Sequence, residues 1–263
     1  MGIDAELETT VARLRAAGCV AAEDEAAQLV GAAGGDRSRL HELVKRRCTG
    51  EPLAWLVGSV RFCGEPVQVH PGVYVPRWQS EPMVHEAVAR LPDGGLAVDL
   101  CTGAGAIAVV LARRRPEARV VATELDPRAA ACARANGVEV FEGDLAAPLP
   151  PSLSGEVDVV TSIVPYVPTG ELRLLPRDVL AHEPRLALDG GADGTDLLVR
   201  AAAAAADLLR PGGSLLLELG GDQAARLEPT LVALGYVAID RMVDDDGDLR
   251  ALTARRAPPP PVL

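Results

Sequence analysis

The spacing of apolar residues changes along this chain, and the change divides it into segments. In the first fifty residues apolar positions recur at helical intervals, as in Leu7, Val11 and Leu14, and again in Leu40, Leu43 and Val44. Such spacing predicts short amphipathic helices, and Asp36 is a suitable N-cap for the third. We therefore expect a small helical bundle, residues 1–58, to precede the rest of the protein.

Residues 59–78 have a different pattern. Val60 and Phe62 precede a Gly64-Glu65 turn, after which Val67 and Val69 alternate with polar residues. Alternation around a turn is typical of a β-hairpin, here one that links two domains.

Beyond this point strand-like and helix-like stretches follow one another regularly. Apolar runs that predict strands lie at 96–100, 120–123, 138–141, 157–163, 215–219, 237–242 and 249–253. Stretches that predict helices lie at 81–91, 106–115, 127–136, 197–209 and 224–234. This order favours an α/β fold with a doubly wound, Rossmann-like, mostly parallel seven-stranded sheet over residues 79–256. The Pro-rich tail, 257–263, is expected to be disordered.

Composition and charge narrow the function classes. Hydrophobic residues make up 48% and charged residues 24% of the chain, as in a soluble globular protein. The net charge of −11 argues against a nucleic-acid partner, and no apolar run is long enough to cross a membrane. The five cysteines have no metal-ligand spacing and no signal peptide is recognisable. We expect a cytoplasmic protein without a metal site.

The strongest local motif is Asp99-Leu-Cys-Thr-Gly-Ala-Gly105, which follows a predicted strand and opens a helix. In this loop Gly103 and Gly105 let the backbone approach a ligand closely, and Cys101, Thr102 and Ala104 are further candidates for cofactor binding. Glu124, followed by Leu125, ends the next strand, where a carboxylate can accept hydrogen bonds from ribose hydroxyls. The glycines alone also fit a dinucleotide site. The carboxylate of Asp99 favours S-adenosylmethionine (SAM) instead.

Two later strand ends supply further candidates. Asp144 can accept from the adenine amino group, and Leu145 can pack on the adenine ring. A solvent-facing loop acid is the alternative for Asp144. The segment Ser162-Ile-Val-Pro-Tyr-Val-Pro168 ends the fourth strand and is expected to face the transferable group, with Tyr166 as a flat surface for a substrate.

With these motifs the chain resembles the HemK/PrmC family, the methyltransferases that modify the glutamine of the Gly-Gly-Gln loop in release factors. The matching segments are Gly50–Leu53, Pro71–Arg77, Asp99–Gly105, His182–Gly194 and Pro211–Gly220. The resemblance implies SAM as cofactor and a substrate-recognition role for the N-terminal helices. His182 lies in one of these segments and is a candidate for the substrate pocket, with a structural or surface role as the alternative. Arg77 can contact an acidic or carbonyl group of a substrate or simply form a salt bridge, and Tyr166 remains a candidate for substrate binding.

The chain departs from the family where the acceptor binds. The family's catalytic loop reads Asn-Pro-Pro-Tyr, whereas here Ile163, Val164, Pro165 and Tyr166 occupy those positions. In the family, the Asn side chain and the next residue's carbonyl accept the two hydrogens of the target amide. Ile163 accepts none, although the carbonyl of Val164 remains. The sequence also has Trp78-Gln-Ser-Glu81 where the family usually carries Pro-Glu-Thr-Glu.

Three hypotheses follow for the function. The first is a HemK-like methyltransferase with a changed acceptor, a small-molecule or protein nitrogen or oxygen nucleophile. The second is release-factor glutamine methylation itself, and the third is SAM binding without turnover. An NAD-dependent oxidoreductase ranks below these because no hydride-transfer residues accompany the glycines. The sequence leaves the oligomeric state open.

Overall fold

The structure, a computed structural model, describes residues 3–258 of the chain. Of the tail expected to be disordered, residues 259–263 lie outside the described residues. Ala257 still continues the last strand's contacts, since its backbone N–H donates a 2.9 Å hydrogen bond to the carbonyl of Gly235.

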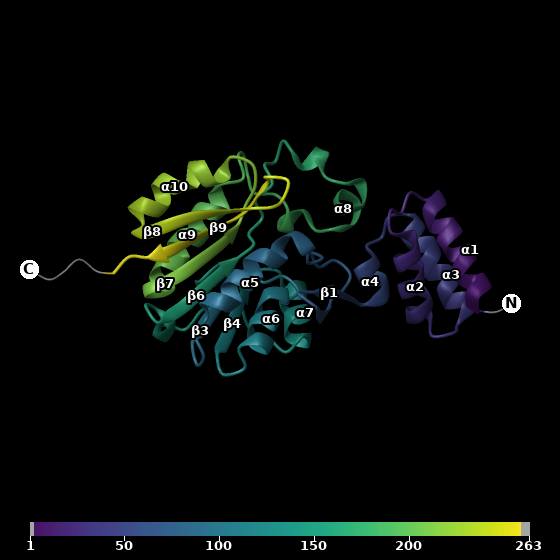
Figure 1. Ribbon diagram of the computed structural model, residues 1–263, viewed down its shortest axis with the longest axis horizontal. Helices are drawn as coiled ribbons and strands as arrows, with labels where there is room; N and C mark the ends of the chain where they lie inside the picture. Colours follow the sequence, from purple (N-terminus) through teal and green to yellow (C-terminus); the bar gives the residue numbers. More distant parts are fainter. Residues whose placement is uncertain (1–2, 259–263) are drawn as a thin grey trace, which may run out of the picture.

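A bundle of short helices forms one end of the molecule (Figure 1). It consists of α1 (Ile3–Ala16), α2 (Ala22–Ala33), α3 (Arg37–Cys48) and a fourth helix, α4 (Leu53–Val57), which the sequence pattern did not predict. The N-cap prediction is confirmed, because the Asp36 side chain accepts a 3.0 Å hydrogen bond from the backbone N–H of Arg39. Apolar faces of all four helices meet in one small core around Leu14, Leu29 and Leu56.

A β-hairpin joins this bundle to the larger part of the molecule (Figure 1). Its strands are β1 (Ser59–Phe62) and β2 (Glu65–Gln68), which pair antiparallel with Phe62 opposite Glu65. The turn therefore comprises Cys63 and Gly64, one residue earlier than the predicted Gly64-Glu65. Both have positive φ, 50° and 81°, as the twist of a two-residue hairpin turn requires.

The larger part is built on a seven-stranded sheet with the order β5-β4-β3-β6-β7-β9-β8. Pairs along the first five strands are parallel, and β9 pairs antiparallel with both β7 and β8. The strands are β3 (Leu96–Leu100), β4 (Arg119–Glu124), β5 (Glu139–Glu142), β6 (Val157–Ser162), β7 (Leu209–Glu218), β8 (Tyr236–Val243) and β9 (Leu249–Arg256). The predicted mostly parallel seven-stranded sheet is confirmed.

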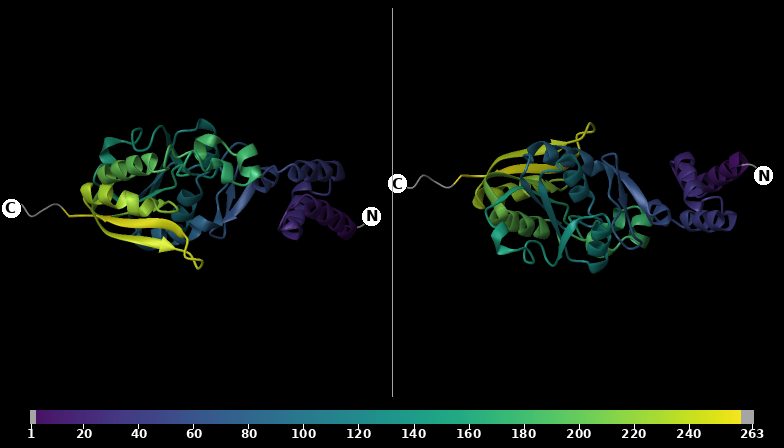
Figure 2. Two further views of the ribbon diagram at one scale, coloured as in Figure 1. Left: turned by 90° about the horizontal axis from the view of Figure 1, so that it is seen from above. Right: turned by 90° about the horizontal axis from the view of Figure 1, so that it is seen from below.

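Helices cover both faces of this sheet (Figure 2). On one face lie α5 (Glu81–Arg90), α6 (Ala106–Arg114) and α7 (Pro127–Ala135), and on the other lie α9 (Asp196–Leu208) and α10 (Gln223–Ala233). A short helix, α8 (Arg177–His182), and the 3₁₀ turns η1 (Trp78–Ser80), η2 (Pro151–Leu153), η3 (Leu172–Leu174) and η4 (Arg185–Ala187) lie in the connections.

Side chains alternate between two cores along the central strands. In β3, Ala97 packs in the core under α5 and α6, whereas Val98 and Leu100 pack in the core under α9 and α10. In α9, Leu198, Ala201, Ala202 and Ala205 are buried at helical spacing. Buried side chains thus recur at every second residue in a strand and at every third or fourth residue in a helix. This difference in spacing explains why strands and helices were predictable from the sequence.

The order in which strands are added to the sheet reverses between β3 and β6. From β3 the chain adds β4 and β5 on one side, and from β6 it adds β7 on the other side. A crevice opens at such a point beyond the carboxyl ends of the strands, and it is the usual ligand site of doubly wound folds. Among the described residues, no helix is long and apolar enough to span a bilayer.

Candidate active site

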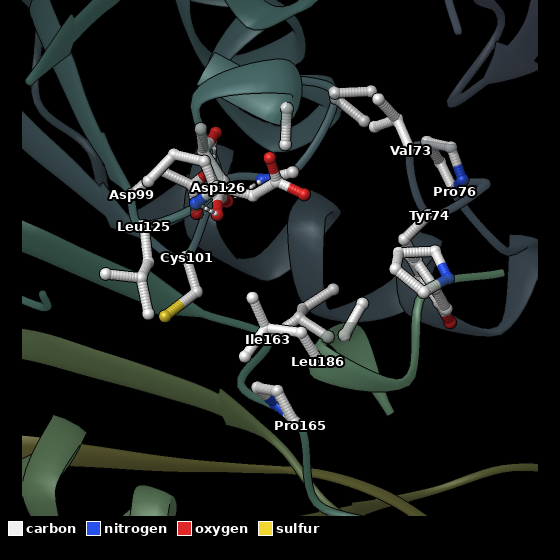
Figure 3. A pocket seen from close by; sticks show the side chains of 18 of the residues that line it. Val73, Tyr74, Pro76, Asp99, Cys101, Leu125, Asp126, Ile163, Pro165 and Leu186 are labelled. Carbon is white, nitrogen blue, oxygen red and sulfur yellow. Dashed lines mark hydrogen bonds between the residues drawn. The ribbon is translucent and has the colours of Figure 1, made fainter. Parts of the chain in front are cut away.

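A pocket of about 390 Å³ lies at the carboxyl ends of β3, β4, β5 and β6. Its volume is within the range of about 300–1,000 Å³ that is typical of small-molecule sites. It brings together most of the residues singled out from the sequence: Arg77, Asp99, Cys101, Thr102, Gly103, Ala104, Glu124, Leu125, Asp144, Leu145, Ile163 and Pro165. Figure 3 shows Ile163, Pro165 and Leu186 grouped apart from Asp99, Cys101 and Leu125.

Asp99 lies at the bottom of this pocket, 1% exposed. Its Oδ1 accepts a 2.7 Å hydrogen bond from the Thr161 hydroxyl, and its Oδ2 accepts one of 2.6 Å from the Thr102 hydroxyl. Burial raises the pKa of Asp99 to about 6, even though both hydrogen bonds favour the charged form. A buried carboxylate of this kind is well placed to bind a cationic group.

The loop after β3 has backbone conformations that few residues adopt. Cys101, Gly103 and Gly105 all have positive φ, at 58°, 59° and 83°. A Cβ at Gly105 would lie 3.0 Å from Ala133 and Val138 side-chain atoms, so this glycine allows α6 to begin close against α7. A Cβ at Gly103 would meet no atom within 4 Å, which leaves free space beside the pocket wall. Burial raises the pKa of the Cys101 thiol to about 12, so Cys101 is not a reactive thiolate.

Glu124 ends β4 on the opposite side of the loop. Its Oε2 accepts a 2.8 Å hydrogen bond from the Gly103 N–H and its Oε1 one of 2.9 Å from the Asp126 N–H. Burial raises its pKa. Each oxygen retains a lone pair, so this carboxylate can still accept from a ligand's hydroxyl groups.

Asp144 and Leu145 follow β5. Asp144 forms an ion pair with Arg200 of α9, and both side chains are about half exposed. Leu145 is buried and has a φ of 47°. The pairing of Asp144 was not predictable, since Arg200 lies 56 residues further along the chain.

The segment after β6 divides between pocket and core. Ile163 and Pro165 line the pocket, whereas the Val164 side chain is buried in the core under α9 and α10. The hydroxyl of Tyr166 donates a 3.0 Å hydrogen bond to Oε1 of Glu218, the last residue of β7. Gly105, Val164, Tyr166 and His182 lie outside the described wall of the pocket.

Arg77 also lines this pocket. Its guanidinium carbon lies 5.2 Å from the centre of the Tyr74 ring, and it forms an ion pair with Glu183. Arg77 and Glu183 also line a second cavity of about 800 Å³, whose wall includes Gln28 and Arg47 of the helical bundle. Arg77 therefore borders both cavities.

His182, next to Glu183, packs elsewhere. Its ring lies 6.3 Å from the Trp55 ring in an edge-on arrangement, and its buried Nε2 has no hydrogen-bond partner in the described structure. The Trp55 indole N–H in turn donates a 2.9 Å hydrogen bond to the carbonyl of Val73.

Sequence analysis missed several residues of this site: Tyr74, Ser80, Glu183, Leu186, Arg200 and Glu218. Glu218 had a usable signal, because it is the one charged residue in the strongly apolar run from Ser214 to Leu219. A charge inside a buried strand generally has a partner or a function. Leu186 and Arg200 had no comparable local signal.

Comparisons with known proteins agree with this fold and site. Residues 81–150 match the model of the family described as "Methyltransferase small domain". A solved structure of ribosomal protein L11 methylase from Lactobacillus delbrueckii subsp. bulgaricus has the same fold, with a TM-score of 0.53 and 16% identity over 74% of this chain and 87% of that chain. The fold and the pocket define a class I SAM-dependent methyltransferase.

Sequence relatives give the family. The chain is 38% identical to "Release factor glutamine methyltransferase" of Geobacter sulfurreducens, over 81% of this chain and 76% of that protein. It is 40% identical to "4-amino-L-phenylalanine/4-methylamino-L-phenylalanine methyltransferase" of Streptomyces pristinaespiralis, over 84% of this chain and 80% of that protein. The protein belongs to the HemK/PrmC family, as the sequence motifs predicted, and S-adenosyl-L-methionine is its cofactor.

Proposed function

We propose that this enzyme transfers the methyl group of SAM to the amino nitrogen of a small aromatic amine. The observation that carries the proposal is the pocket wall at Ile163, where the family's amide-binding Asn is replaced by an apolar side chain. A primary amide brought to this wall would lose one acceptor for its N–H groups. An aromatic ring loses nothing there.

The cofactor half of the pocket has donors and acceptors that fit SAM. Asp99 would bind the ammonium of the methionine end, and Glu124 would accept hydrogen bonds from the ribose hydroxyls. Asp144 would accept a hydrogen bond from the adenine amino group, and Leu125 and Leu145 would pack on the adenine ring. In the loop of Cys101, Thr102, Gly103 and Ala104, Gly103 would let the cofactor lie close to the backbone, and Gly105 allows the loop to turn into α6. When bound, SAM supplies a methyl group that a sulfonium centre has already activated.

The acceptor half is apolar and suits a flat ring. Ile163, Pro165 and Leu186 lie together on one side, and Val73, Tyr74 and Pro76 line the outer part (Figure 3). Such walls exclude water from an uncharged amine, whose lone pair is then free to attack. Methyl transfer needs little more than this nucleophile held in line with the methyl group.

Arg77 supports an acceptor with a carboxylate. One side of its guanidinium is paired with Glu183, and Tyr74 lies against its face. A guanidinium has five N–H donors in a planar fork, so it can bind a second carboxylate while it keeps the first. The relative from Streptomyces pristinaespiralis is named for an aromatic amine that is also an α-amino acid. We assign Arg77 to the carboxylate of such an acceptor.

We also propose that residues 1–58 form a recognition domain, 59–78 a hairpin linker and 79–256 the catalytic domain. The second cavity supports this division, because its wall includes Gln28 and Arg47 from the bundle together with Asp178 and Glu183 from the catalytic part. In this arrangement the bundle helps to enclose the acceptor's polar end beyond Arg77.

The proposal is tested by measuring transfer of labelled methyl from SAM to 4-amino-L-phenylalanine and to a release factor, under identical conditions. We expect label on the amine and little on the Gly-Gly-Gln glutamine. Phenylalanine, which lacks the ring amine, is the control acceptor. Efficient labelling of the glutamine with none on the amine would instead establish the second candidate, release-factor methylation.

That second candidate is favoured by one observation. Relatives named as release factor glutamine methyltransferases align over most of the chain, at 38% identity over 95% of it for the protein of Mycolicibacterium smegmatis. In that case the carbonyl of Val164 would be the remaining acceptor for the amide.

A further inference from the structure

Ser80 connects the pocket to a buried carboxylate. It is the last residue of η1, just before α5, and it is 4% exposed while still lining the pocket. Its hydroxyl donates a short hydrogen bond to Oε2 of Glu218. Glu218 ends β7, directly behind the pocket wall, and is 7% exposed.

Glu218 is held by two hydroxyl groups. Ser80 donates to one carboxylate oxygen and Tyr166 donates to the other, at 3.0 Å. An ionised carboxylate has no hydrogen, so both hydroxyls must donate to it. Burial raises the pKa of Glu218, and the two hydroxyl bonds act in the opposite direction by stabilising the charged form.

This pairing determines what Ser80 can offer to a ligand. A serine hydroxyl has one hydrogen and two lone pairs, and here the hydrogen is directed to Glu218. The side of the oxygen that is not bonded to Glu218 therefore presents lone pairs. Beside the apolar side chains of Ile163 and Pro165, which line the same pocket, Ser80 is therefore a hydrogen-bond acceptor whose own hydrogen is already used.

We propose that Oγ of Ser80 accepts a hydrogen bond from the amino N–H of the methyl acceptor and so replaces the acceptor that the family's Asn supplies at the position of Ile163. Glu218 is the positioning residue, since it orients the Ser80 hydroxyl and does not touch the substrate. This inference rests on the proposed function, and it names the feature that selects an N–H nucleophile.

The proposed hydrogen bond from the amino N–H to Oγ of Ser80 stabilises the transition state more than the ground state. As the N–C bond forms, the C–S bond of SAM breaks and S-adenosylhomocysteine is the leaving group. The amino nitrogen becomes positively charged, so its N–H becomes a stronger donor to Ser80, and the methylated product then loses one proton to water. An oxyanion or thiolate nucleophile carries no hydrogen and would face the lone pairs of Ser80 directly. Ser80 therefore favours amines over phenolates and thiolates of the same shape.

The test compares Ser80→Ala with Ser80→Thr, which keeps the hydroxyl. With 4-amino-L-phenylalanine we expect Ser80→Ala to lower kcat by a factor on the order of 10–100 and Ser80→Thr to stay within about threefold of the wild type. SAM affinity, measured by calorimetry, should be unchanged in both. An unchanged kcat in Ser80→Ala would overturn the assignment.

A binding measurement gives a second readout that does not depend on turnover. Loaded with S-adenosylhomocysteine, the wild type should bind 4-amino-L-phenylalanine more tightly than 4-methyl-L-phenylalanine, by about threefold to tenfold, and Ser80→Ala should lose this preference. Equal binding of the two ligands to the wild type overturns the proposal. If Ser80→Ala folds poorly, Ser80→Cys takes its place in this test. Its thiol can still donate to Glu218 but is a weak hydrogen-bond acceptor, so this variant should also lose the preference.

The two proposals fail in different ways. A wild type that does not methylate the amine contradicts the proposed function. A wild type that methylates it equally well without the Ser80 hydroxyl contradicts only the Ser80 assignment. If the wild type methylates only the glutamine, the same variants test Ser80 against the amide N–H, and an unchanged rate in Ser80→Ala again overturns its role.

Discussion

The hydroxyl of Thr161 on β6 donates a 2.7 Å hydrogen bond to Oδ1 of Asp99 on β3, directly across the pair of strands where the sheet reverses its order. This bond, with the one from Thr102, holds the carboxylate in a single orientation at the bottom of the pocket. A group oriented in this way needs no rearrangement when a cation binds.

The first prediction concerns pH. Because burial raises the pKa of Asp99 to about 6, protonation below that pH removes the charge that we propose binds the SAM ammonium. SAM affinity should fall, by up to about tenfold per pH unit, as pH decreases below about 6. Calorimetric titrations across this range measure the effect. Asp99→Asn should bind SAM weakly at every pH and show a flatter profile.

The stability of the protein without SAM should depend on pH in the opposite direction, because proton binding is linked to folding. A carboxyl group with a raised pKa binds its proton more tightly in the folded state than in the unfolded state. The contribution of Asp99 to stability should therefore increase as pH falls from about 6 towards its ordinary value of 3.8. Denaturant unfolding of the wild type and Asp99→Asn separates this contribution from those of other carboxyl groups, including Glu124.

Ile163→Asn should change the acceptor without changing the cofactor. The new amide can accept an N–H from glutamine, so the rate on a Gly-Gly-Gln substrate should rise, by up to about 10²-fold. The rate on the aromatic amine should fall because a polar group enters an apolar wall. Ile163→Leu, which keeps the wall apolar, is the control. SAM affinity should be the same in all three proteins, and a shift there would argue against this division of the pocket.

Arg77→Lys tests recognition of the carboxylate. Lysine keeps the positive charge but loses the planar fork and the stacking on Tyr74, so KM for 4-amino-L-phenylalanine should rise about tenfold. KM for 4-methylaniline, which has no carboxylate, should change little. If KM rises equally for both substrates, Arg77 supports the structure of the pocket and does not bind the carboxylate.

Leu215→Ala tests the core under α9 and α10. Leu215 is fully buried in β7, and removing its side chain leaves a cavity, so the free energy of unfolding should fall by about 2–5 kcal/mol. Chemical denaturation measures it. Val232→Ala, on the exposed face of α10, should change stability by less than about 0.5 kcal/mol. A similar loss in both variants would contradict the assignment of Leu215 to the core.

Much of the fold was predictable from local patterns. Six of the seven strands lie within about three residues of their predicted bounds, because buried parallel strands and amphipathic helices have different apolar periods. The exception is β7, which begins at Leu209 although the predicted range was 215–219. The pocket-lining position of the loop after Asp99 was predictable, because glycines at a strand-to-helix turn are typical of a backbone that approaches a ligand closely.

The differences arise where pairing with distant residues decides the structure. Leu209 was expected at the end of a helix, but it begins β7 because it pairs with Val157 of β6. Likewise, Cys63 adopts a positive φ and moves the hairpin turn by one residue, since Phe62 pairs with Glu65. No local preference in the sequence specifies either pairing.

By itself the sequence determined the order of strands and helices, the family and the strand-to-helix loop at Asp99–Gly105, because these depend on residues close together in the chain. The tertiary structure alone decided which polar groups meet. Arg77 forms an ion pair with Glu183, which lies 106 residues further along the chain, and Ser80 donates a hydrogen bond to Glu218, which lies 138 residues further along. Such pairs form because buried polar groups must satisfy one another, and the partner is whichever group the packed strands and turns bring within reach.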